Sequence, residues 1–206
     1  MTTQTPLGLG VLVSGTGSNL QAILEAIRAG SLAARVKVVI SNRANVKALE
    51  RARSAGVPAL TISHKAFDSR EAFDRALLTA LRAAGVDWVV LAGFMRVLTP
   101  EFLRGYPGRV INIHPALLPA FPGVDAAQQA LDYGVKVTGC TVHFVDRGVD
   151  SGKIIAQRAV SVEASDDLGT LSARIHAAEH ELFVAVLRDI AAGRIAPLET
   201  EATRPD

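Results

Sequence analysis

The chain has 206 residues, of which 49% are hydrophobic and 20% charged, the balance of an ordinary globular protein. Its 22 basic and 20 acidic residues leave a net charge of +2, which gives no electrostatic case for binding nucleic acid. The single cysteine, Cys140, excludes an intramolecular disulfide and a cysteine-based zinc site.

The N-terminus and the hydropathy pattern bear on where the protein works. Residues 1–6 lack the basic and apolar regions of a signal peptide, and no apolar run is long enough to span a membrane. We therefore expect a cytoplasmic protein with no membrane partner. No repeat, low-complexity block or linker interrupts the chain, so we expect a single domain over residues 1–206.

Hydrophobic periodicity divides the chain into strands and helices. Short apolar, β-prone runs predict strands, and apolar residues spaced by three and four predict helices. In chain order we expect a strand at 7–13, a helix at 20–30, a strand at 36–40, a helix at 46–55, a strand at 58–62, a helix at 68–85 capped by Asp68, a strand at 87–92, a short helix from 99, a strand at 109–114, a helix at 124–133, strands at 136–145 and 154–160, and a long helix at 168–192. This order predicts the α/β class, with a doubly wound, mostly parallel, Rossmann-like sheet followed by a C-terminal strand pair and a long helix.

The first strand runs into the glycine loop, Gly15-Thr16-Gly17-Ser18-Asn19, directly before a helix. A helix N-terminus offers free N–H groups and a positive dipole end to a phosphate. Leu20 breaks the G-x-G-x-x-G fingerprint, no P-loop lysine follows, and the second strand ends near Arg43 rather than an acidic residue. The loop therefore predicts a phosphate site, with a plain glycine turn capped by Ser18 or Asn19 as the alternative.

Asn112 and His114 are polar residues in the otherwise apolar run that ends at Pro115. Residues two apart in a strand face the same side, and ligands bind at the carboxyl ends of parallel strands. An amide can hold a carbonyl oxygen, and an imidazolium can stabilise negative charge that develops on it. The run predicts a catalytic centre, with a satisfied core histidine and a strand-end cap as the alternative.

Other polar groups lie on predicted loops and helix ends. The turn-rich loop 146–152 carries Asp146 and Asp150, and either serves as a surface connection or brings a carboxylate that raises the pKa of His114. Arg70 lies in the first turn of its predicted helix, where the dipole disfavours a cation, so it is either an exposed arginine or a contact for an anionic ligand.

Residues 176–180 match the H-x-x-E-H pattern of inverted zinc peptidases. His176 and His180 can share one face of a helix, but a catalytic zinc site needs a further protein ligand. Too few residues follow His180 to build a second ligand-bearing helix, which disfavours a metalloprotease. Glu179, on the same helix, is a better candidate for a functional residue than the two histidines.

Five stretches occur together in an order that is far more specific than any one of them. The stretches are Gly15-Thr16-Gly17-Ser18-Asn19-Leu20-Gln21, Leu91-Ala92-Gly93-Phe94-Met95-Arg96, Asn112-Ile113-His114-Pro115-Ala116-Leu117-Leu118-Pro119, Val149-Asp150-Ser151-Gly152 and Glu179-His180. The set resembles the phosphoribosylglycinamide formyltransferases, which belong to the folate-dependent formyltransferase family of purine synthesis, over about residues 7–193.

The resemblance implies the formyltransferase fold, with a nucleotide-binding half at about 7–110, a folate-binding and catalytic half at about 111–193, and a polar tail at 194–206. It implies transfer of a formyl group from 10-formyltetrahydrofolate, as co-substrate, to the amine of glycinamide ribonucleotide, without a metal. Both substrates are small molecules, and the protein would act as a monomer or homodimer with no nucleic-acid partner.

The resemblance also implies roles for single residues. The catalytic set would be Asn112, His114 and Asp150. The nucleotide substrate would contact Gly17, Ser18, Asn19, His176 and Glu179. Folate would contact Arg70, Met95, Arg96, Val97, Leu98, Asn112, Asp146 and Asp150. The sequence departs from the family at Ala120, Asp125 and Lys153, which bears on pocket electrostatics and loop stiffness rather than on the reaction.

Several rival functions remain. A formyltetrahydrofolate deformylase is expected to carry an N-terminal domain, for which there is no room before Leu7. A methionyl-tRNA formyltransferase is expected to carry a further C-terminal domain and a more basic surface. A nicotinamide-dependent reductase would use the glycine loop and Arg43. A non-catalytic nucleotide-binding module would leave Asn112, His114 and Asp150 unexplained.

Overall fold

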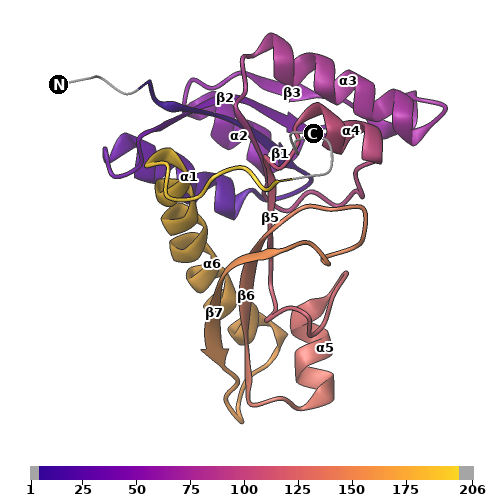
Figure 1. The fold of residues 1–206 in the computed structure, drawn as a ribbon. Coiled ribbons are helices and arrows are strands. Elements are labelled where there is room, and N and C mark those ends of the chain that lie inside the picture. The colour runs from indigo at the N-terminus through magenta and orange to yellow at the C-terminus, as the bar shows by residue number, and fades with distance from the viewer. Residues whose placement is uncertain (1–4, 200–206) are drawn as a thin grey trace.

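The computed structural model describes residues 5–199, in which seven strands form one sheet (Figure 1). Residues 200–206 of the predicted polar tail lie outside this range. The strands span Leu7–Val13 (β1), Ala34–Ser41 (β2), Ala59–Thr61 (β3), Trp88–Leu91 (β4), Val110–His114 (β5), Val137–Phe144 (β6) and Ile154–Ser161 (β7). The helices span Ser18–Arg28 (α1), Lys47–Ser54 (α2), Arg70–Ala83 (α3), Pro100–Gly105 (α4), Ala126–Tyr133 (α5) and Leu168–Ala191 (α6), with a short 3-10 helix at His64–Ala66 (η1).

The strand order is β3-β2-β1-β4-β5-β6-β7, and the first five strands run parallel. β6 pairs antiparallel with β5, and β7 pairs antiparallel with β6. The predicted fold class is therefore confirmed. The order reverses between β1 and β4, so the loops that follow these two strands flank the point where doubly wound sheets bind ligands.

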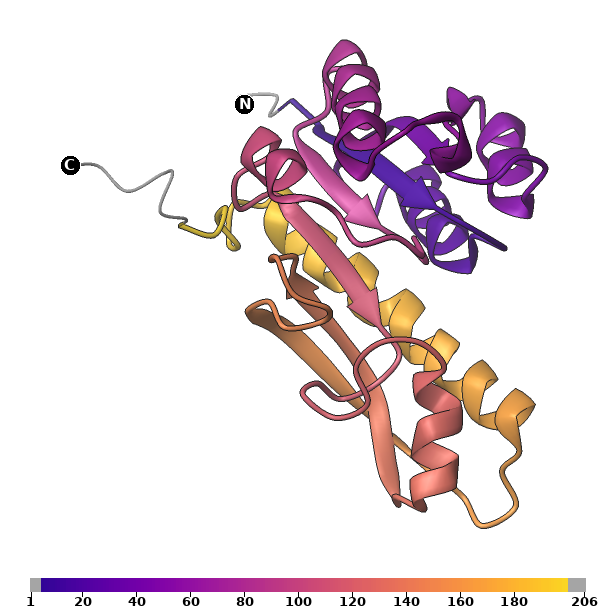
Figure 2. The same cartoon turned by 90° about the vertical axis from the view of Figure 1, so that its right-hand side faces the viewer.

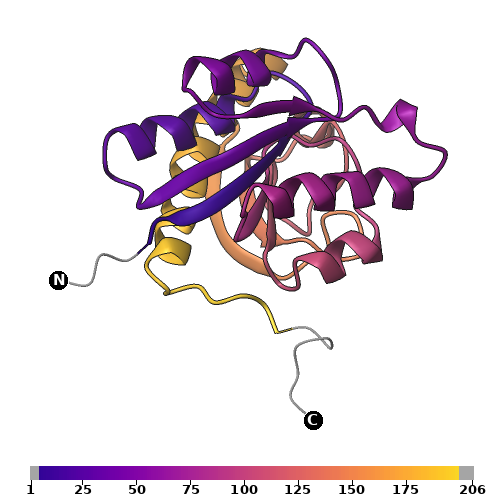
Figure 3. The ribbon, with the colours of Figure 1, turned by 90° about the horizontal axis from the view of Figure 1, so that it is seen from above.

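The parallel part of the sheet is covered by helices on both faces, because its strands are apolar on both sides (Figure 3). Val11 and Val13 of β1 pack in the core cluster formed with α1, α2 and α6, whereas Leu12 packs in the cluster formed with α3 and α4. The long helix α6 runs beside the antiparallel half of the sheet, as Figure 2 shows. Among residues 5–199 no helix is long and apolar enough to cross a membrane.

The predicted elements all form, with bounds shifted by a few residues, but two helix caps differ from expectation. Ser69, rather than Asp68, caps α3, because its side chain accepts a hydrogen bond from Ala72 N. Gly17, rather than Ser18 or Asn19, is the N-cap of α1, and no side chain caps that helix. The second difference leaves the first N–H groups of α1 without an intrahelical or capping partner.

Candidate active site

The glycine loop is a tight turn held against α2. Gly17 has a φ of 71°, and a Cβ atom built there would lie 2.6 Å from the Cβ of Ala48. Ala48 N donates to Gly15 O at 3.1 Å, and Arg51 Nε donates to Thr16 O at 3.0 Å. Only glycine fits at position 17, and the fixed turn presents the uncapped start of α1 to a ligand.

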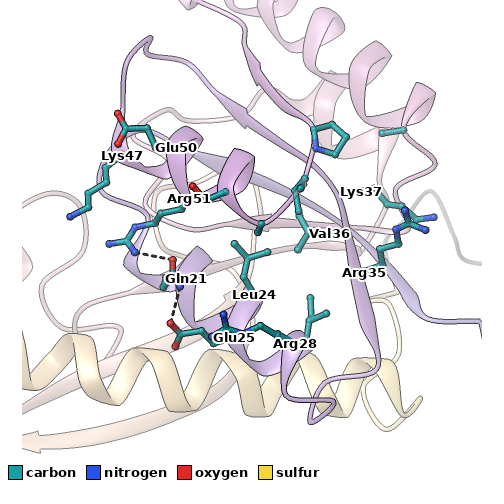
Figure 4. A pocket seen from close by; sticks show the side chains of 17 residues that line it. Gln21, Leu24, Glu25, Arg28, Arg35, Val36, Lys37, Lys47, Glu50 and Arg51 are labelled. Atoms are coloured by element: carbon teal, nitrogen blue, oxygen red, sulfur yellow. Dashed lines mark hydrogen bonds between the residues drawn. The ribbon is translucent and has the colours of Figure 1, made fainter.

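A hollow of about 1070 Å³ lies behind this loop, between α1 and α2 (Figure 4). On its wall Arg51 Nη1 donates to Gln21 Oε1 at 2.9 Å, and Gln21 Nε2 donates to Glu25 Oε1 at 2.8 Å. None of the predicted site residues lines it. The hollow therefore affects the site only indirectly, because Arg51 on its wall hydrogen-bonds Thr16 of the glycine loop.

Asn19 and Glu179, 160 positions apart in the chain, meet beside the glycine loop. Asn19 Nδ2 donates to Glu179 Oε2 at 3.0 Å, and Glu179 is only 4% exposed. Burial raises the pKa of the Glu179 carboxyl to about 7, against the opposing effect of the Asn19 hydrogen bond. Asn19 Oδ1 is buried without a partner among the described residues. The structure thus joins two predicted nucleotide-binding residues and leaves one acceptor open.

His176 lies one helical turn before Glu179 on α6 and is exposed. His180 Nε2 is buried without a hydrogen-bond partner in the described part of the chain, and burial, followed by the charge of His176, lowers the pKa of His180. Within residues 5–199 no group of three or more histidine, cysteine, aspartate or glutamate side chains is placed to hold a metal ion. The H-x-x-E-H pattern therefore lacks a further ligand there.

The carboxyl end of β5 meets the loop after β6. His114, 4% exposed, has its Nδ1 atom 3.2 Å from Asp150 Oδ2 and its Nε2 atom 2.7 Å from Phe121 O. Both oxygens can only accept hydrogen bonds. The doubly protonated imidazolium is therefore the form of His114 that satisfies both contacts.

Asn112 reaches the same carboxylate, with Nδ2 3.4 Å from Asp150 Oδ1 and 3.2 Å from His143 Nε2. Asn112 and His143 face each other directly in the antiparallel register of β5 and β6. His143 Nδ1 donates to the carbonyl oxygen of Phe144 at 2.8 Å, so in the neutral ring Nε2 is the acceptor for Asn112. The two predicted groups of β5 thus converge on one carboxylate, as their spacing implied.

Sequence reasoning did not single out His143, which is 2% exposed and lies 3.6 Å from Asp150 Oδ1. The available signal was a lone imidazole near the end of an apolar strand. Its partner could be found only from the register of β6 against β5, because a one-residue shift would turn the ring to the other face of the sheet.

Asp150 is the acceptor at the centre of this cluster. Burial acts to raise the pKa of its carboxyl, but the nearby ring of His143, the hydrogen bond from Gly123 N at 2.8 Å and the charge of His114 outweigh burial and lower that pKa. Its backbone φ is 52°, a strained value for a residue with a side chain. A lowered pKa keeps the carboxylate charged at neutral pH.

A cavity of about 390 Å³ opens next to the cluster. Its walls are the loop after β4, the end of β5 and the loop 146–150, and they include all the predicted folate residues except Arg70. Arg70 contacts the wall instead, since its Nη2 atom donates to Val97 O at 2.8 Å. Of the three departures from the family, only Asp125 lines the cavity, whereas Ala120 and Lys153 are exposed elsewhere.

Comparison with known proteins gives consistent results. The formyl transferase family model matches residues 9–187. The crystal structure of glycinamide ribonucleotide transformylase 1 from Symbiobacterium toebii is 53% identical, with a TM-score of 0.91 over 93% of this chain and 91% of that one. The phosphoribosylglycinamide formyltransferase of Escherichia coli is 44% identical over 95% of this chain and 92% of its own length.

Some relatives are much longer proteins. The trifunctional purine biosynthetic protein adenosine-3 of Drosophila pseudoobscura is 49% identical over 99% of this chain, but that match spans only 15% of the relative's length. In that protein the matching region is one part of a larger polypeptide.

Proposed function

The chain belongs to the formyl transferase family, and we propose that it transfers the formyl group of 10-formyltetrahydrofolate to the amine of glycinamide ribonucleotide. The products are N-formylglycinamide ribonucleotide and tetrahydrofolate, in the synthesis of purine nucleotides. The observation that carries the proposal is the convergence of Asn112 and His114 on Asp150 at the edge of a 390 Å³ cavity. The likeness to a bacterial phosphoribosylglycinamide formyltransferase over nearly all of both chains supports it.

In this proposal the amine nitrogen forms a bond to the formyl carbon, and negative charge develops on the formyl oxygen. His114 Nε2–H, which donates to Phe121 O in the structure, exchanges that carbonyl for the developing oxyanion. Asn112 adds a second dipole at the same place. The bond from the carbon to the folate nitrogen then breaks as the oxygen's charge collapses.

Asp150 supports this step in two ways. Its carboxylate, 3.2 Å from His114 Nδ1, stabilises the imidazolium that the oxyanion requires. It also accepts the proton that the attacking amine loses, through water, and passes it to the departing folate nitrogen. Atoms and charge balance without an added redox partner or metal, so we propose metal-independent catalysis.

The nucleotide substrate has a proposed site of its own at the glycine loop. The start of α1 at Gly17 and Ser18 provides free N–H groups for the phosphate. Asn19, at the start of α1, would contact the phosphate, and Glu179, which Asn19 contacts, would take the ribose together with His176 one turn earlier on α6. Holding both substrates in fixed orientation supplies a large part of the rate.

Folate would occupy the 390 Å³ cavity, with Met95, Arg96, Val97 and Leu98 around its ring system. Arg70, at the start of α3, would meet the carboxylates of the folate tail, and Asp146 would contribute from the loop after β6. We propose that the protein acts in the cytoplasm as a monomer or homodimer, with no partner other than its substrates.

The direct test is to incubate the purified protein with 10-formyltetrahydrofolate, with and without glycinamide ribonucleotide, and to follow the release of tetrahydrofolate. Release that requires the nucleotide is the expected result. Equal release without the nucleotide would assign the chain to deformylation instead. No release under either condition would refute both folate-dependent reactions.

A further inference from the structure

Ser14 follows the last residue of β1 and directly precedes the glycine loop. It is 3% exposed and does not line the folate cavity. Its backbone N–H donates to Gly93 O at 3.0 Å, and its hydroxyl oxygen accepts from Met95 N at 2.9 Å. Gly93 and Met95 both belong to the wall of the cavity. One buried residue therefore ties the two substrate loops together across the point where the strand order reverses.

The hydroxyl has a defined orientation. Because its oxygen accepts from Met95 N–H, its single proton is free to donate to Asn42 Oδ1, which lies 2.6 Å away. Asn42, 3% exposed at the end of β2, has its Nδ2 atom 3.4 Å from His64 Nδ1. The His64 ring therefore holds the Asn42 amide at its nitrogen, which leaves the amide oxygen facing Ser14.

The wall of the cavity has separate supports further along. Arg70 donates to Val97 O, and the buried Asp74 carboxylate accepts from Thr99 N at 2.7 Å. Both of these supports come from α3, which carries no part of the nucleotide loop. Ser14 is different because it directly precedes Gly15 of the glycine loop and also hydrogen-bonds the loop after β4. A displacement of either loop at Ser14 therefore moves the other loop as well.

We propose that Ser14 is a positioning residue. It fixes the distance between the glycine loop at residues 15–19, the nucleotide loop, and the loop after β4 at residues 93–98, the folate loop, and Asn42 orients its hydroxyl. This inference rests on the proposed formyl transfer, in which the amine held from one loop must meet the formyl carbon held from the other. Small displacements of reacting groups cost far more in rate than in binding. Loss of the Ser14 hydroxyl should therefore lower kcat by a larger factor than it lowers the affinity for either substrate alone.

The test compares Ser14→Ala with a matched control, Ser41→Ala. Ser41 is also a fully buried serine at the end of a parallel strand, and its hydroxyl makes two hydrogen bonds, both to Arg43 in its own turn. We expect kcat to fall about 10-fold in Ser14→Ala, with each binary dissociation constant changed by less than about threefold. In Ser41→Ala we expect kcat within about twofold of the parent despite a similar loss of buried hydrogen bonds.

A second pair tests the same contact without altering Ser14. Asn42→Ala removes the acceptor of the Ser14 hydroxyl and should lower kcat as Ser14→Ala does. Asn42→Asp keeps an oxygen in that place and should retain most of the activity. If Ser14→Ala fails to fold, this pair of variants alone decides the question. The proposal would be overturned if kcat fell equally in Asn42→Ala and Asn42→Asp, or if it fell in neither.

The outcomes separate this inference from the reaction on which it rests. A parent enzyme without nucleotide-dependent release of tetrahydrofolate would refute the transfer reaction and the inference with it. A normal parent enzyme with Ser14→Ala within twofold of its kcat would overturn the inference alone. Equal losses of kcat in Ser14→Ala and Ser41→Ala would also overturn it, since they would reflect general loosening of the sheet edge.

Discussion

Two carboxyl groups, one in each half of the proposed site, lie in opposite electrostatic surroundings. Asp150 accepts a hydrogen bond from Gly123 N and faces the rings of His114 and His143. Glu179 has one hydrogen-bond partner, the neutral amide of Asn19. The pKa of Asp150 lies below its usual value although burial opposes this, whereas burial raises the pKa of Glu179 to about 7.

The difference teaches that partners, rather than burial alone, decide the charge of a buried carboxyl group. The proposed catalytic region keeps the Asp150 carboxylate ionised, which suits a group that is proposed to stabilise an imidazolium. The proposed nucleotide region holds a carboxyl group whose pKa burial raises to about 7. A protonated carboxyl group can both donate and accept hydrogen bonds, which suits ribose hydroxyls better than it suits a phosphate.

The largest effect is expected at Asp150. Asp150→Asn keeps the shape but removes the charge that supports His114, so kcat should fall by about 100-fold or more, with substrate affinities much less affected. Asp146→Asn, in the same loop, is the comparison, since Asp146 hydrogen-bonds only within its turn, to Gly148 N and Ser151 Oγ. Steady-state kinetics of both variants would check this. An Asp150→Asn enzyme near the parental rate would remove the basis for contrasting the two regions.

Glu179→Gln should remove the pH dependence of stability that the Glu179 carboxyl contributes. The Glu179 carboxyl has a pKa of about 7 when folded and an ordinary value of 4.5. Between these values the unfolded chain loses the proton while the folded chain keeps it, so the parent loses stability as pH rises. Relative to Glu179→Gln, its free energy of unfolding should fall by about 2 kcal/mol from pH 4.5 to 7. Urea unfolding of both proteins at several pH values measures this, and parallel curves would contradict it.

A change at Gly17 should affect the nucleotide region alone. Gly17→Ala places a methyl group against Ala48 at a φ that disfavours side chains, so the loop must shift. We expect the KM for the nucleotide to rise about 10-fold and folate affinity to change little. Gly15→Ala, whose added methyl group meets nothing within 4 Å, should have a smaller effect. A fall in folate affinity instead would show that the loop had been assigned to the wrong substrate.

The smallest effect is expected at the folate end. Arg70→Ala should weaken folate binding by on the order of 1 kcal/mol, about fivefold, because an exposed ion pair contributes little. Nucleotide binding should not change. Arg75→Ala on the same helix is the control, since Arg75 pairs with Glu101 at the surface. Equal folate affinities of the Arg70→Ala enzyme and the parent at low salt would leave Arg70 as a support for Val97 only.

Much of the fold could be predicted from the sequence because its determinants are local. Apolar runs of strand length alternate with helical periodicity, and β-α alternation restricts the topology to few choices. The shared face of Asn112 and His114 followed from strand geometry alone. The cap of α3 could not be settled in this way, because Asp68 and Ser69 are both good capping residues and only the backbone selects Ser69.

Contacts between segments that are distant in the chain could not be predicted from the sequence. The pairing of Asn19 with Glu179 depends on how α6 packs against α1, and the position of His143 depends on strand register. The contact of His114 Nε2 with Phe121 O places a backbone carbonyl where the proposed oxyanion would bind. Backbone groups carry no residue-specific pattern, so no sequence rule could have indicated this contact.

The central claim is that His114 and Asp150 act as one unit, and a double-mutant cycle tests it most directly. The measurement is kcat for His114→Ala, Asp150→Asn and the double variant, each confirmed as folded. Each single change should lower kcat by about 100-fold or more, and the double variant should be little slower than the worse single one, because groups that act together are not additive. Fully multiplicative losses, about 10,000-fold in the double variant, would contradict the account.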